Sequence, residues 1–506
     1  MNNMQPTKFQ YFIQNFIWKF ILAMVTSIFP FLIRSLMIQK WGLEYLGING
    51  LFSSVLQVLN IAELGMGSAI LYSMYKPMAE QNLTLVNALL NLYRKIYTAL
   101  GIGILIIGLL LLPFIPFLIH GNVPEDVNIY VIYLLQLSNA SLGYIVCAYW
   151  NVVLQANQKI SIDCKIGSIL TGIMYIMQLL VICNFKNYYL YIVWLPLTTI
   201  AQNTIRAIYV RRRYPLIRCK GKVDALFIKD FYKRVFAMSL SKIRTAIRSS
   251  IDSIVISANL GLIVLAQYQN YYQVMLIPIS FAGIVKTAVL PSFGVSVATG
   301  SKEENFHIFE IYTFAYNWLA IWFTACLLCL TQNFMCLWTG IENVLSNSVV
   351  SLLCVYFYLH CISENALMIR ETTGVWWIGK EGAVIETASN LILNIVLVRY
   401  WGVHGVLIAT ILTLLCINLP FEYISIFKGY FEVNVRQYLK KQIVYLLNAI
   451  FIGIVMKAVC DRFPIGSFKA LIMEGLICII LPNLLLILLN FHRKEFKEII
   501  QRLKVV

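Results

Sequence analysis

The sequence has little charge for its length. Charged residues make up 12% of the 506 residues, whereas hydrophobic residues make up 60% and the mean hydropathy is +0.76. Soluble globular proteins carry about 25% charged residues. Apolar runs of about 20 residues, the length that crosses a bilayer, recur along the whole chain. The composition therefore excludes the soluble classes and predicts a polytopic membrane protein, with no nucleic acid as a partner.

Motifs of enzymes and metal sites are also scarce. The five histidines are scattered and form no HExxH or similar ligand spacing. The run Gly374–Lys380 has P-loop spacing, but Glu381 stands where Ser or Thr would bind Mg²⁺. Most of the twelve cysteines lie in apolar runs, and Cys326 and Cys329 have neither a second pair nor a histidine nearby. We therefore expect no enzyme activity, no cofactor, no disulfide framework and no metal.

The basic excess follows the connections between apolar runs. Lys and Arg outnumber Asp and Glu by 40 to 23, and they gather in alternate connections, most densely in 211–233. The first apolar run begins near Tyr11, carries Lys19 and Arg34, and has no small-residue cleavage site after it, so we expect no cleaved signal peptide. The positive-inside rule then predicts that both termini are cytosolic.

Apolar runs predict an all-α membrane protein of about fourteen transmembrane helices. The expected spans are 11–38, 46–74, 90–118, 128–153, 162–184, 187–209, 234–259, 263–296, 307–331, 347–369, 382–400, 403–427, 440–459 and 468–491. We divide the chain into an N-terminal six-helix bundle (1–210), a cytosolic basic linker (211–233), a C-terminal six-helix bundle (234–428), and a helix pair with a basic cytosolic tail (429–506).

A weak internal repeat supports two pseudo-symmetric bundles. Trp41–Gly47 aligns with Leu260–Ala266, and at the same offset of 219 residues Ser68–Ser73 aligns with Thr287–Ser292. Six spans per repeat is an even number, so both copies enter the membrane in the same direction. An axis along the membrane normal would relate them, as in a two-lobe transporter.

Span 234–259 carries charges that lipid would reject. At 100° per residue, one arc holds Ser241, Arg244, Thr245, Arg248, Ser249 and Asp252. A charge at bilayer mid-depth costs about 2.5–3.5 kcal/mol, so Arg244, Arg248, Asp252 and the adjacent Lys242 must face protein or a wet cavity. Two interpretations remain. Asp252 pairs with Arg248 in an internal network, or the arc lines a cationic pathway for an anionic substrate.

Other polar residues within the spans extend this hypothesis. We expect Arg34 and Lys286 to join Lys242, Arg244 and Arg248 around a central cationic cavity, with Asp252 and Glu63 as orienting or coupling acids. Arg34 and Lys286 could instead snorkel to an interface, and Glu63 could simply pair with a cation. The tyrosines Tyr268, Tyr271 and Tyr272 are candidates for sugar contacts, or members of an interfacial aromatic belt.

Glycine-based motifs give the chain a family resemblance. Tyr45–Phe52, Ala62–Ile70, Ser389–Asn394 and Tyr400–Thr410 resemble the polysaccharide (O-antigen) flippases of the multidrug/oligosaccharidyl-lipid/polysaccharide (MOP) exporter superfamily. The resemblance covers nearly the whole chain. It implies a bacterial inner-membrane flippase that carries undecaprenyl-diphosphate-linked oligosaccharide, such as an O-antigen repeat unit of lipopolysaccharide, from the cytosolic to the periplasmic leaflet by alternating access.

The implied partners are the polyprenyl-diphosphate-linked oligosaccharide, membrane lipids, H⁺ or Na⁺ as the coupling ion, and polysaccharide polymerase machinery. Guanidinium groups suit a diphosphate because their planar fork binds phosphate oxygens in pairs. Three alternatives stay open at this point: a multidrug/cation antiporter of the same superfamily, a membrane glycan polymerase or ligase, and a scaffold for the assembly machinery.

Overall fold

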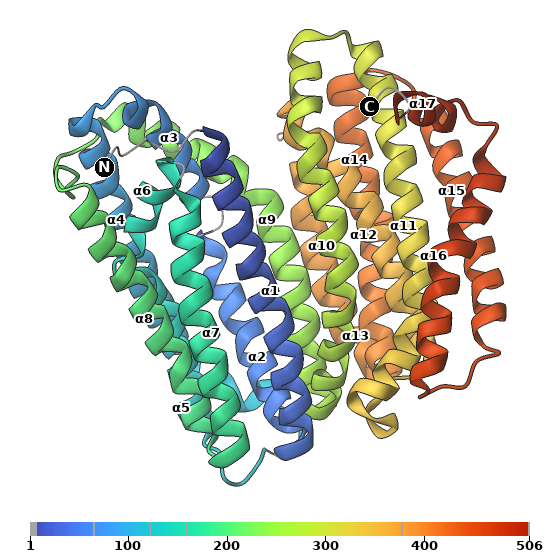
Figure 1. The fold of residues 1–506 in the computed structure, drawn as a ribbon, viewed down its shortest axis with the longest axis horizontal. Helices are drawn as coiled ribbons and strands as arrows, with labels where there is room; N and C mark the ends of the chain where they lie inside the picture. Colours follow the sequence, from blue (N-terminus) through green and yellow to red (C-terminus); the bar gives the residue numbers. More distant parts are fainter. Residues whose placement is uncertain (1–7, 64–65, 122, 158, 376–377, 504–506) are drawn as a thin grey trace. The chain divides into compact units, whose positions relative to one another are not determined.

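The protein is described by a computed structural model that covers residues 8–63, 66–121, 123–157, 159–375 and 378–503. Every regular element in these ranges is a helix (Figure 1). Contacts divide the chain into two compact units, Met1–Ala266 (unit 1) and Gln267–Val506 (unit 2). The predicted all-α class is confirmed.

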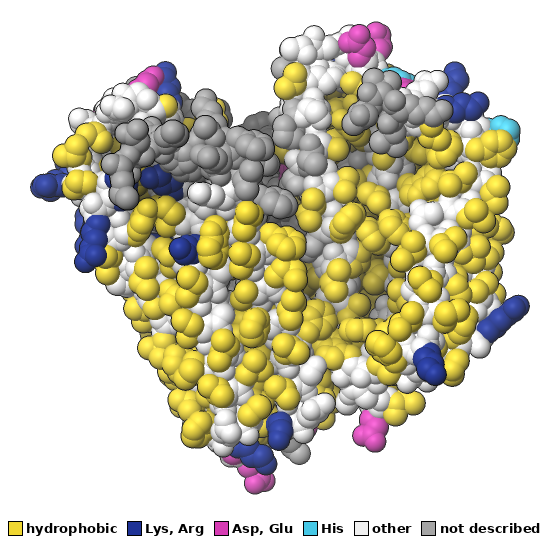
Figure 2. All heavy atoms as spheres, viewed as in Figure 1, with side chains coloured by type: hydrophobic (Ala, Val, Ile, Leu, Met, Phe, Trp, Pro, Cys, Tyr) yellow, Lys and Arg dark blue, Asp and Glu magenta, His cyan; other side chains and the backbone are white. Residues whose placement is uncertain are grey.

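Long apolar helices make the chain a multi-pass membrane protein. Among the described residues, nine helical segments are long and apolar enough to cross a bilayer, and a tenth results if a bent pair counts as one span. Two shorter apolar helices, Leu43–Leu59 and Ser250–Leu260, add to these. In Figure 2, apolar side chains cover the middle of the visible face of each unit, as expected of surfaces that contact lipid. The count of fourteen spans stays a prediction.

Unit 1 is built from helices α1 to α9. Its elements are α1 (Lys8–Lys40), α2 (Leu43–Leu59), η1 (Asn60–Glu63), α3 (Met66–Ala79), α4 (Leu83–Leu111), η2 (Leu112–Leu118), α5 (Ile129–Ile145), η3 (Ala148–Trp150), α6 (Asn151–Ala156), α7 (Ile160–Asn184), α8 (Tyr188–Arg213) and α9 (Ala225–Leu260). The main packing pairs are α1 with α7, α4 with α5, α5 with α8, and α2 with α9. Asn82, Asn128 and Asn187 begin α4, α5 and α8, and each accepts a hydrogen bond from a first-turn amide.

Unit 2 contains α10 to α17, and α10 starts just before the division. Its elements are α10 (Leu262–Thr299), α11 (Lys302–Thr339), η4 (Ile341–Asn343), α12 (Asn347–Thr373), α13 (Lys380–Thr413), η5 (Leu414–Asn418), α14 (Leu419–Ile426), η6 (Phe427–Phe431), α15 (Val435–Cys460), α16 (Phe468–Asn490) and α17 (Lys494–Leu503). Helix α11 is central, because α12, α15, α16 and α17 all pack against it. A capping box formed by Ser301 and Glu304 fixes its start.

The chain reverses direction at Gly402, inside the segment assigned as α13. Gly402 has φ 56° and ψ −133°, which interrupts the helix. The Asn390 Nδ2 donates to the Thr410 Oγ1 at 3.1 Å. In one straight helix, residues 20 apart would lie about 30 Å from each other, so the segments on either side of Gly402 must be antiparallel. This hairpin matches the predicted separation of span 382–400 from span 403–427.

Two glycines give structural support to the internal repeat. Gly42 precedes α2 with φ 108° and ψ 174°, and Gly261 precedes α10 with φ 91° and ψ 176°. The positions are those paired by the repeat, and side-chain-bearing residues rarely adopt such angles. The division into two six-helix bundles stays a prediction. Contacts place α9, which we expected to open the second bundle, in unit 1, because it packs against α2.

Candidate functional site

A polar cavity of about 540 Å³ lies in unit 1 beside the end of α2. Glu63, at the end of the 3₁₀ turn η1, lines it, and the Tyr97 hydroxyl donates to the Glu63 Oε1 at 2.7 Å. The Tyr97 ring packs edge-on against Tyr93, with ring centroids 4.1 Å apart. A Cβ at Gly67 would lie 3.3 Å from the Tyr97 hydroxyl and 3.6 Å from the Glu63 Oε1. The glycine therefore leaves room around the carboxylate.

A break between α5 and α6 forms another wall of this cavity. The chain bends by 46° between the two helices, and Cys147 at the break has φ 54°. The Asn203 Nδ2 donates to the carbonyl of Gly143 at 3.3 Å, which satisfies an acceptor near the broken end of α5. Neutral polar side chains complete the lining: Asn60, Asn139, Asn151, Gln155, Thr199 and Asn203. Broken helices of this kind often form ion or substrate sites in transporters.

The chemistry of this cavity suits a small cation or a proton. Neither Lys nor Arg occurs among the described residues that line it, and Glu63 is the carboxylate there. Carboxylate and amide oxygens are ligands for hard cations, so Glu63, Asn60 and Asn139 are the side chains that could hold one. The Thr199 hydroxyl already donates to the Asn139 Oδ1 at 2.7 Å, which orients that amide. The cavity is a poor host for a phosphate.

Helix α9 contains the predicted cationic arc. Arg248 and Asp252 are both buried on it, together with Ser250, Ser253 and Ser257. The side chains of Lys242 and Arg244 lie outside the described residues. At 100° per residue, the three serines lie on the side of α9 opposite Arg248 and Asp252, so buried polar side chains occupy more than one face of this helix. Whether the face with Arg248 and Asp252 lines a pathway stays a prediction.

Arg34 and Lys286 lie in different surroundings. Arg34 is half-buried on α1. Its guanidinium group interacts electrostatically with the Tyr191 side chain of α8. The Lys286 Nζ lies 2.9 Å from the Glu364 Oε2 and 3.2 Å from the Glu371 Oε2, so two carboxylates of α12 hold it. To bind a diphosphate, Lys286 would have to leave these partners. Its predicted role in substrate binding gains no support from this geometry.

The three tyrosines of α10 also differ from one another. Tyr271 is buried, and its hydroxyl donates to the Gln332 Oε1 at 3.0 Å and accepts from the Leu345 amide at 3.0 Å. This hydroxyl joins α10, α11 and the loop before α12, which is a structural role. Tyr268 and Tyr272 stack on each other with centroids 6.2 Å apart. Sugar contact by Tyr268 and Tyr272 stays a prediction.

An apolar groove of about 630 Å³ lies in unit 2 between α12, α14 and α15. Two π-helical turns, η5 and η6, flank α14 and widen the helix there. Fourteen of the residues that line the groove are apolar or aromatic, among them Leu359, Leu419, Ile424, Phe427, Ile443 and Leu446. Lys428, Asn434 and Gln442 supply the polar lining. The apolar lining suits a hydrocarbon chain, and α15 supplies one wall of the groove.

The first half of the basic linker folds back onto unit 1. The Asn91 Nδ2 donates to the Gly221 carbonyl at 2.8 Å, and the Arg218 amide donates to the Asn87 Oδ1 at 2.7 Å. A pocket of about 360 Å³ results, lined by the cations Arg94, Arg211, Arg218 and Lys220. None of these four has a carboxylate partner among the residues described, so the pocket is net positive.

Comparisons with known proteins give similarity at the level of fold. No family model matches the sequence, and no curated protein matches it. The lipid II flippase MurJ in an inward closed conformation is 15% identical, with a TM-score of 0.68, and the match covers 94% of this chain and 98% of that one. A multidrug resistance MATE transporter of the MOP superfamily, inward-facing, is 14% identical over 81% of this chain and 97% of its own, with a TM-score of 0.65.

An outward-facing MATE structure matches less well, with a TM-score of 0.57, 14% identity, and coverage of 82% of this chain and 94% of that one. This chain has the fold of the MOP transporters. These matches show the fold alone, and membership of that superfamily stays a prediction. The flippase match extends over more of the chain than the two MATE matches do, by an amount comparable to the C-terminal segment α15–α17.

Several ion pairs between buried or half-buried side chains were not foreseen from the sequence. Glu371 joins Glu364 at Lys286, Glu422 pairs with Arg370 at 3.0 Å, and Asp163 pairs with Arg206 at 2.7 Å. The spacing of Glu364 and Glu371, seven residues apart on one helix, was an available signal that both face the same neighbour. The other pairs join different helices, and local periodicity carries no sign of them.

Proposed function

We propose that this protein is a flippase for undecaprenyl-diphosphate-linked oligosaccharide, moving O-antigen or another surface-polysaccharide repeat unit from the cytosolic to the periplasmic leaflet. The observation that carries the proposal is the apolar groove beside α15, within a transporter fold. A substrate with a polyprenyl tail needs an apolar track for that tail, whereas a small drug cation does not. The MurJ structure, with a similar fold over 94% of this chain, is named a lipid flippase.

The diphosphate head requires cations. We assign Arg248, a buried cation of the arc on α9, to the diphosphate. Asp252 would orient this arginine. The supporting cations would be Lys242, Arg244 and Arg34. An arginine in a low-dielectric site binds phosphate through two parallel, charge-assisted hydrogen bonds. Lys286 has a weaker claim, because Glu364 and Glu371 already neutralise it.

The cavity around Glu63 suggests how transport is driven. One carboxylate, a tyrosine donor and a set of amides can exchange a proton or hold Na⁺. We assign Glu63 as the coupling acid. The same observation favours a second candidate, a multidrug/cation antiporter, since an acidic cavity without Lys or Arg could also admit an organic cation.

The sidedness of lipid-linked oligosaccharide separates these functions. The gene for this protein would be deleted in its host, and the fraction of lipid-linked glycan that a periplasmic glycosidase can cut would be measured. The flippase predicts that lipid-linked glycan accumulates on the cytosolic leaflet, and that wild type and Arg248→Lys restore exposure while Arg248→Ala does not. Arg212→Ala, which changes an exposed arginine outside the pockets described, is the matched control.

Membrane levels of each variant would be measured in parallel. If Arg248→Ala lowers the membrane level of the protein as much as it lowers transport, Arg248 has a structural role. Unchanged sidedness in the deletion strain would refute the flippase, and efflux of organic cations would then be measured for the antiporter.

A further inference from the structure

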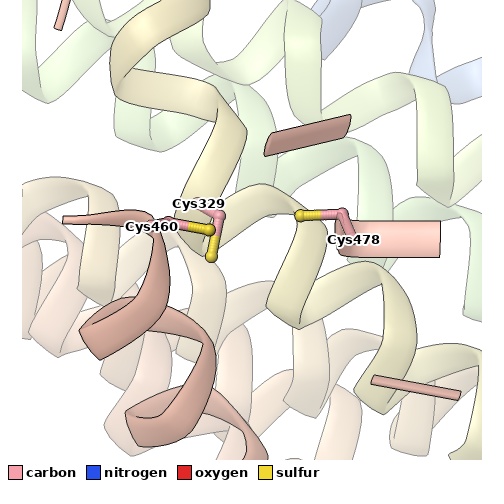
Figure 3. Close-up of side chains that lie close together, drawn as sticks. All are labelled: Cys329, Cys460 and Cys478. Atoms are coloured by element: carbon pink, nitrogen blue, oxygen red, sulfur yellow. The ribbon is translucent and has the colours of Figure 1, made fainter. Parts of the chain in front are cut away.

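Three thiols meet where α11, α15 and α16 pack together (Figure 3). They belong to Cys329 of α11, Cys460 at the end of α15, and Cys478 of α16, and all three side chains are buried. Their Sγ atoms all lie within 4.8 Å of one another. From the sequence we expected no metal site at Cys329, because a second pair was missing. The fold supplies the missing thiols from residues more than 100 positions away.

We propose that these three cysteines bind one soft d¹⁰ cation, Zn²⁺ or Cu⁺. Thiolates select such ions. A metal–sulfur bond of about 2.3 Å places three sulfurs about 4.0 Å apart around the ion, so the cluster needs to close by less than about one ångström. A disulfide would need about 2.05 Å and would leave the third thiol unused. On binding, each S–H bond is replaced by a sulfur–metal bond, and the protons pass to water.

Hydrogen bonds on both sides of the cluster hold α16 on α11. The Trp322 Nε1 donates to the Cys478 carbonyl at 2.8 Å, and the Cys326 thiol donates to the same oxygen at 3.7 Å. One turn away, the Asn333 Nδ2 donates to the Glu474 Oε2 at 3.0 Å, while the Asn333 Oδ1 accepts from the Gly466 amide at 2.8 Å. These bonds fix the register of the two helices, so two ligands are pre-positioned without the metal.

The turn next to the cluster is exposed and carries charged side chains. Cys460 is followed by Asp461, whose side chain is 57% exposed, so the turn after α15 reaches water. Lys457, one turn before Cys460, lies 2.6 Å from the Asp461 carboxylate. Three thiolates around Zn²⁺ carry one net negative charge, and Lys457 is a cation one helical turn from Cys460 on the same helix.

Binding would join the C-terminal helix pair to the bundle. Cys460 and Cys478 stand on the two helices of the pair, and Cys329 stands on the central helix α11. A three-thiolate site would thus clamp α15, which forms one wall of the apolar groove. This role requires no particular substrate, so it is independent of the proposed function.

Metal uptake by the purified full-length protein tests the site. The reduced protein would be titrated with Zn²⁺ alone and, separately, with Cu⁺ alone, and bound metal measured after desalting. We expect one equivalent of one of the ions on wild type, and loss of that equivalent in Cys329→Ser, Cys460→Ser and Cys478→Ser. Cys361→Ser, which removes another buried thiol of unit 2, should keep it.

Thiol protection provides a second measurement that needs no variant. Alkylation of wild type, mapped by mass spectrometry, should be slowed by the metal at the three cluster cysteines and unchanged at the exposed Cys183 and Cys416. The proposal would be overturned if wild type binds no more metal than Cys460→Ser and the metal does not slow alkylation of the three cysteines. The proposal would also be overturned if the reduced protein binds neither ion and mild oxidation forms a Cys329–Cys460 disulfide.

Discussion

The Glu63 cavity of unit 1 and the ion pairs of unit 2 hold their charges differently, although unit 1 also contains the Asp163–Arg206 pair at 2.7 Å. In unit 1, Glu63 faces a polar cavity, and its hydrogen-bond donor is the neutral Tyr97. In unit 2, Lys286, Arg370 and Lys441 are each held by carboxylates at 2.7–3.2 Å. A carboxylate held by a neutral donor can gain or lose a proton or cation, whereas a paired charge must first break its pair. Under the proposed function, ion coupling would belong to the Glu63 cavity of unit 1, and the substrate tail would occupy the apolar groove of unit 2.

The largest effect is expected from breaking the Arg370–Glu422 pair of unit 2. Its side chains are 7% and 0% exposed, and Arg370 also donates to the carbonyls of Val375 and Ile378. Arg370→Met would remove the cation that pairs with the buried Glu422 carboxylate, at a cost of about 3–5 kcal/mol. Thermal unfolding in detergent should show a strong loss of stability.

Two controls sharpen this prediction. Lys76→Met, in a pair that is 84% and 56% exposed, should cost almost nothing. The double variant Arg370→Met, Glu422→Leu should recover much of the loss, because no unpaired charge remains. If Arg370→Met unfolds at the wild-type temperature, the pair does not stabilise unit 2.

A substitution at Glu63 in unit 1 should change the transport rate rather than the stability of the protein. Glu63→Gln keeps an acceptor for the Tyr97 hydroxyl but removes the charge from the cavity. We expect flipping to fall about tenfold or more, the scale of a typical coupling free energy, with unchanged thermal unfolding. Glu44→Gln, the same change outside the cavity, is the control. A Glu63→Gln protein that flips at the wild-type rate would exclude Glu63 as the coupling acid.

The groove of unit 2 can be blocked without disturbing its ion pairs. Ile443 and Leu447 of α15 are 56% and 58% exposed, yet Ile443 lines the groove and Leu447 does not. Ile443→Trp should slow flipping several-fold by filling space that the tail needs, while Leu447→Trp should not. The rates would be compared at equal membrane levels. Equal rates in the two variants would argue against a tail in this groove.

The smallest effect concerns the docking of α17 on unit 2. Burial is the largest single influence on the pKa of Glu495 and acts to raise it, but the hydrogen bond from Lys441 and the positive charges nearby together hold this pKa below its ordinary value of 4.5. Lys441 also contacts Glu310, and Arg493 acts in the same direction. A carboxyl with a lowered folded pKa contributes stability above its ordinary value and loses it as the pH falls through the lowered value.

Hydrogen exchange of the α17 amides checks this prediction. Exchange should be slow at neutral pH, and the helix should loosen below about pH 4.5 as Glu495 takes up its proton. Glu495→Gln should remove much of this acid response. An identical acid response in Glu495→Gln would assign the titration to another group, such as Glu310 or Glu498.

Local sequence features predicted much of the fold. Apolar run lengths located the helices, Gly42 and Gly261 marked matching turns, and the chain reversal near Gly402 fell between two predicted spans. The arc on α9 correctly indicated that Arg248 and Asp252 are buried. These features depend on neighbours a few residues away, which periodicity reports directly.

Long-range partners could not be predicted in this way. Helical spacing puts Glu364 and Glu371 on one face but does not identify Lys286 as their partner, and it does not indicate that Cys460 and Cys478 would meet Cys329. The assignment of α9 to unit 1 also depends on packing against α2, 180 to 200 residues away, rather than on the basic linker that precedes it. Such contacts are set by tertiary packing, which hydrophobic periodicity leaves open.

The most direct test of the account is to ask which lipid occupies the groove. A photo-crosslinking residue placed at 443, and separately at 447, would be activated in membranes that contain the lipid-linked oligosaccharide, and the adducts identified by mass spectrometry. The account predicts polyprenyl-diphosphate adducts enriched over phospholipid at position 443 and not at 447. The same phospholipid-dominated adducts at both positions would contradict the assignment of the groove to the substrate tail.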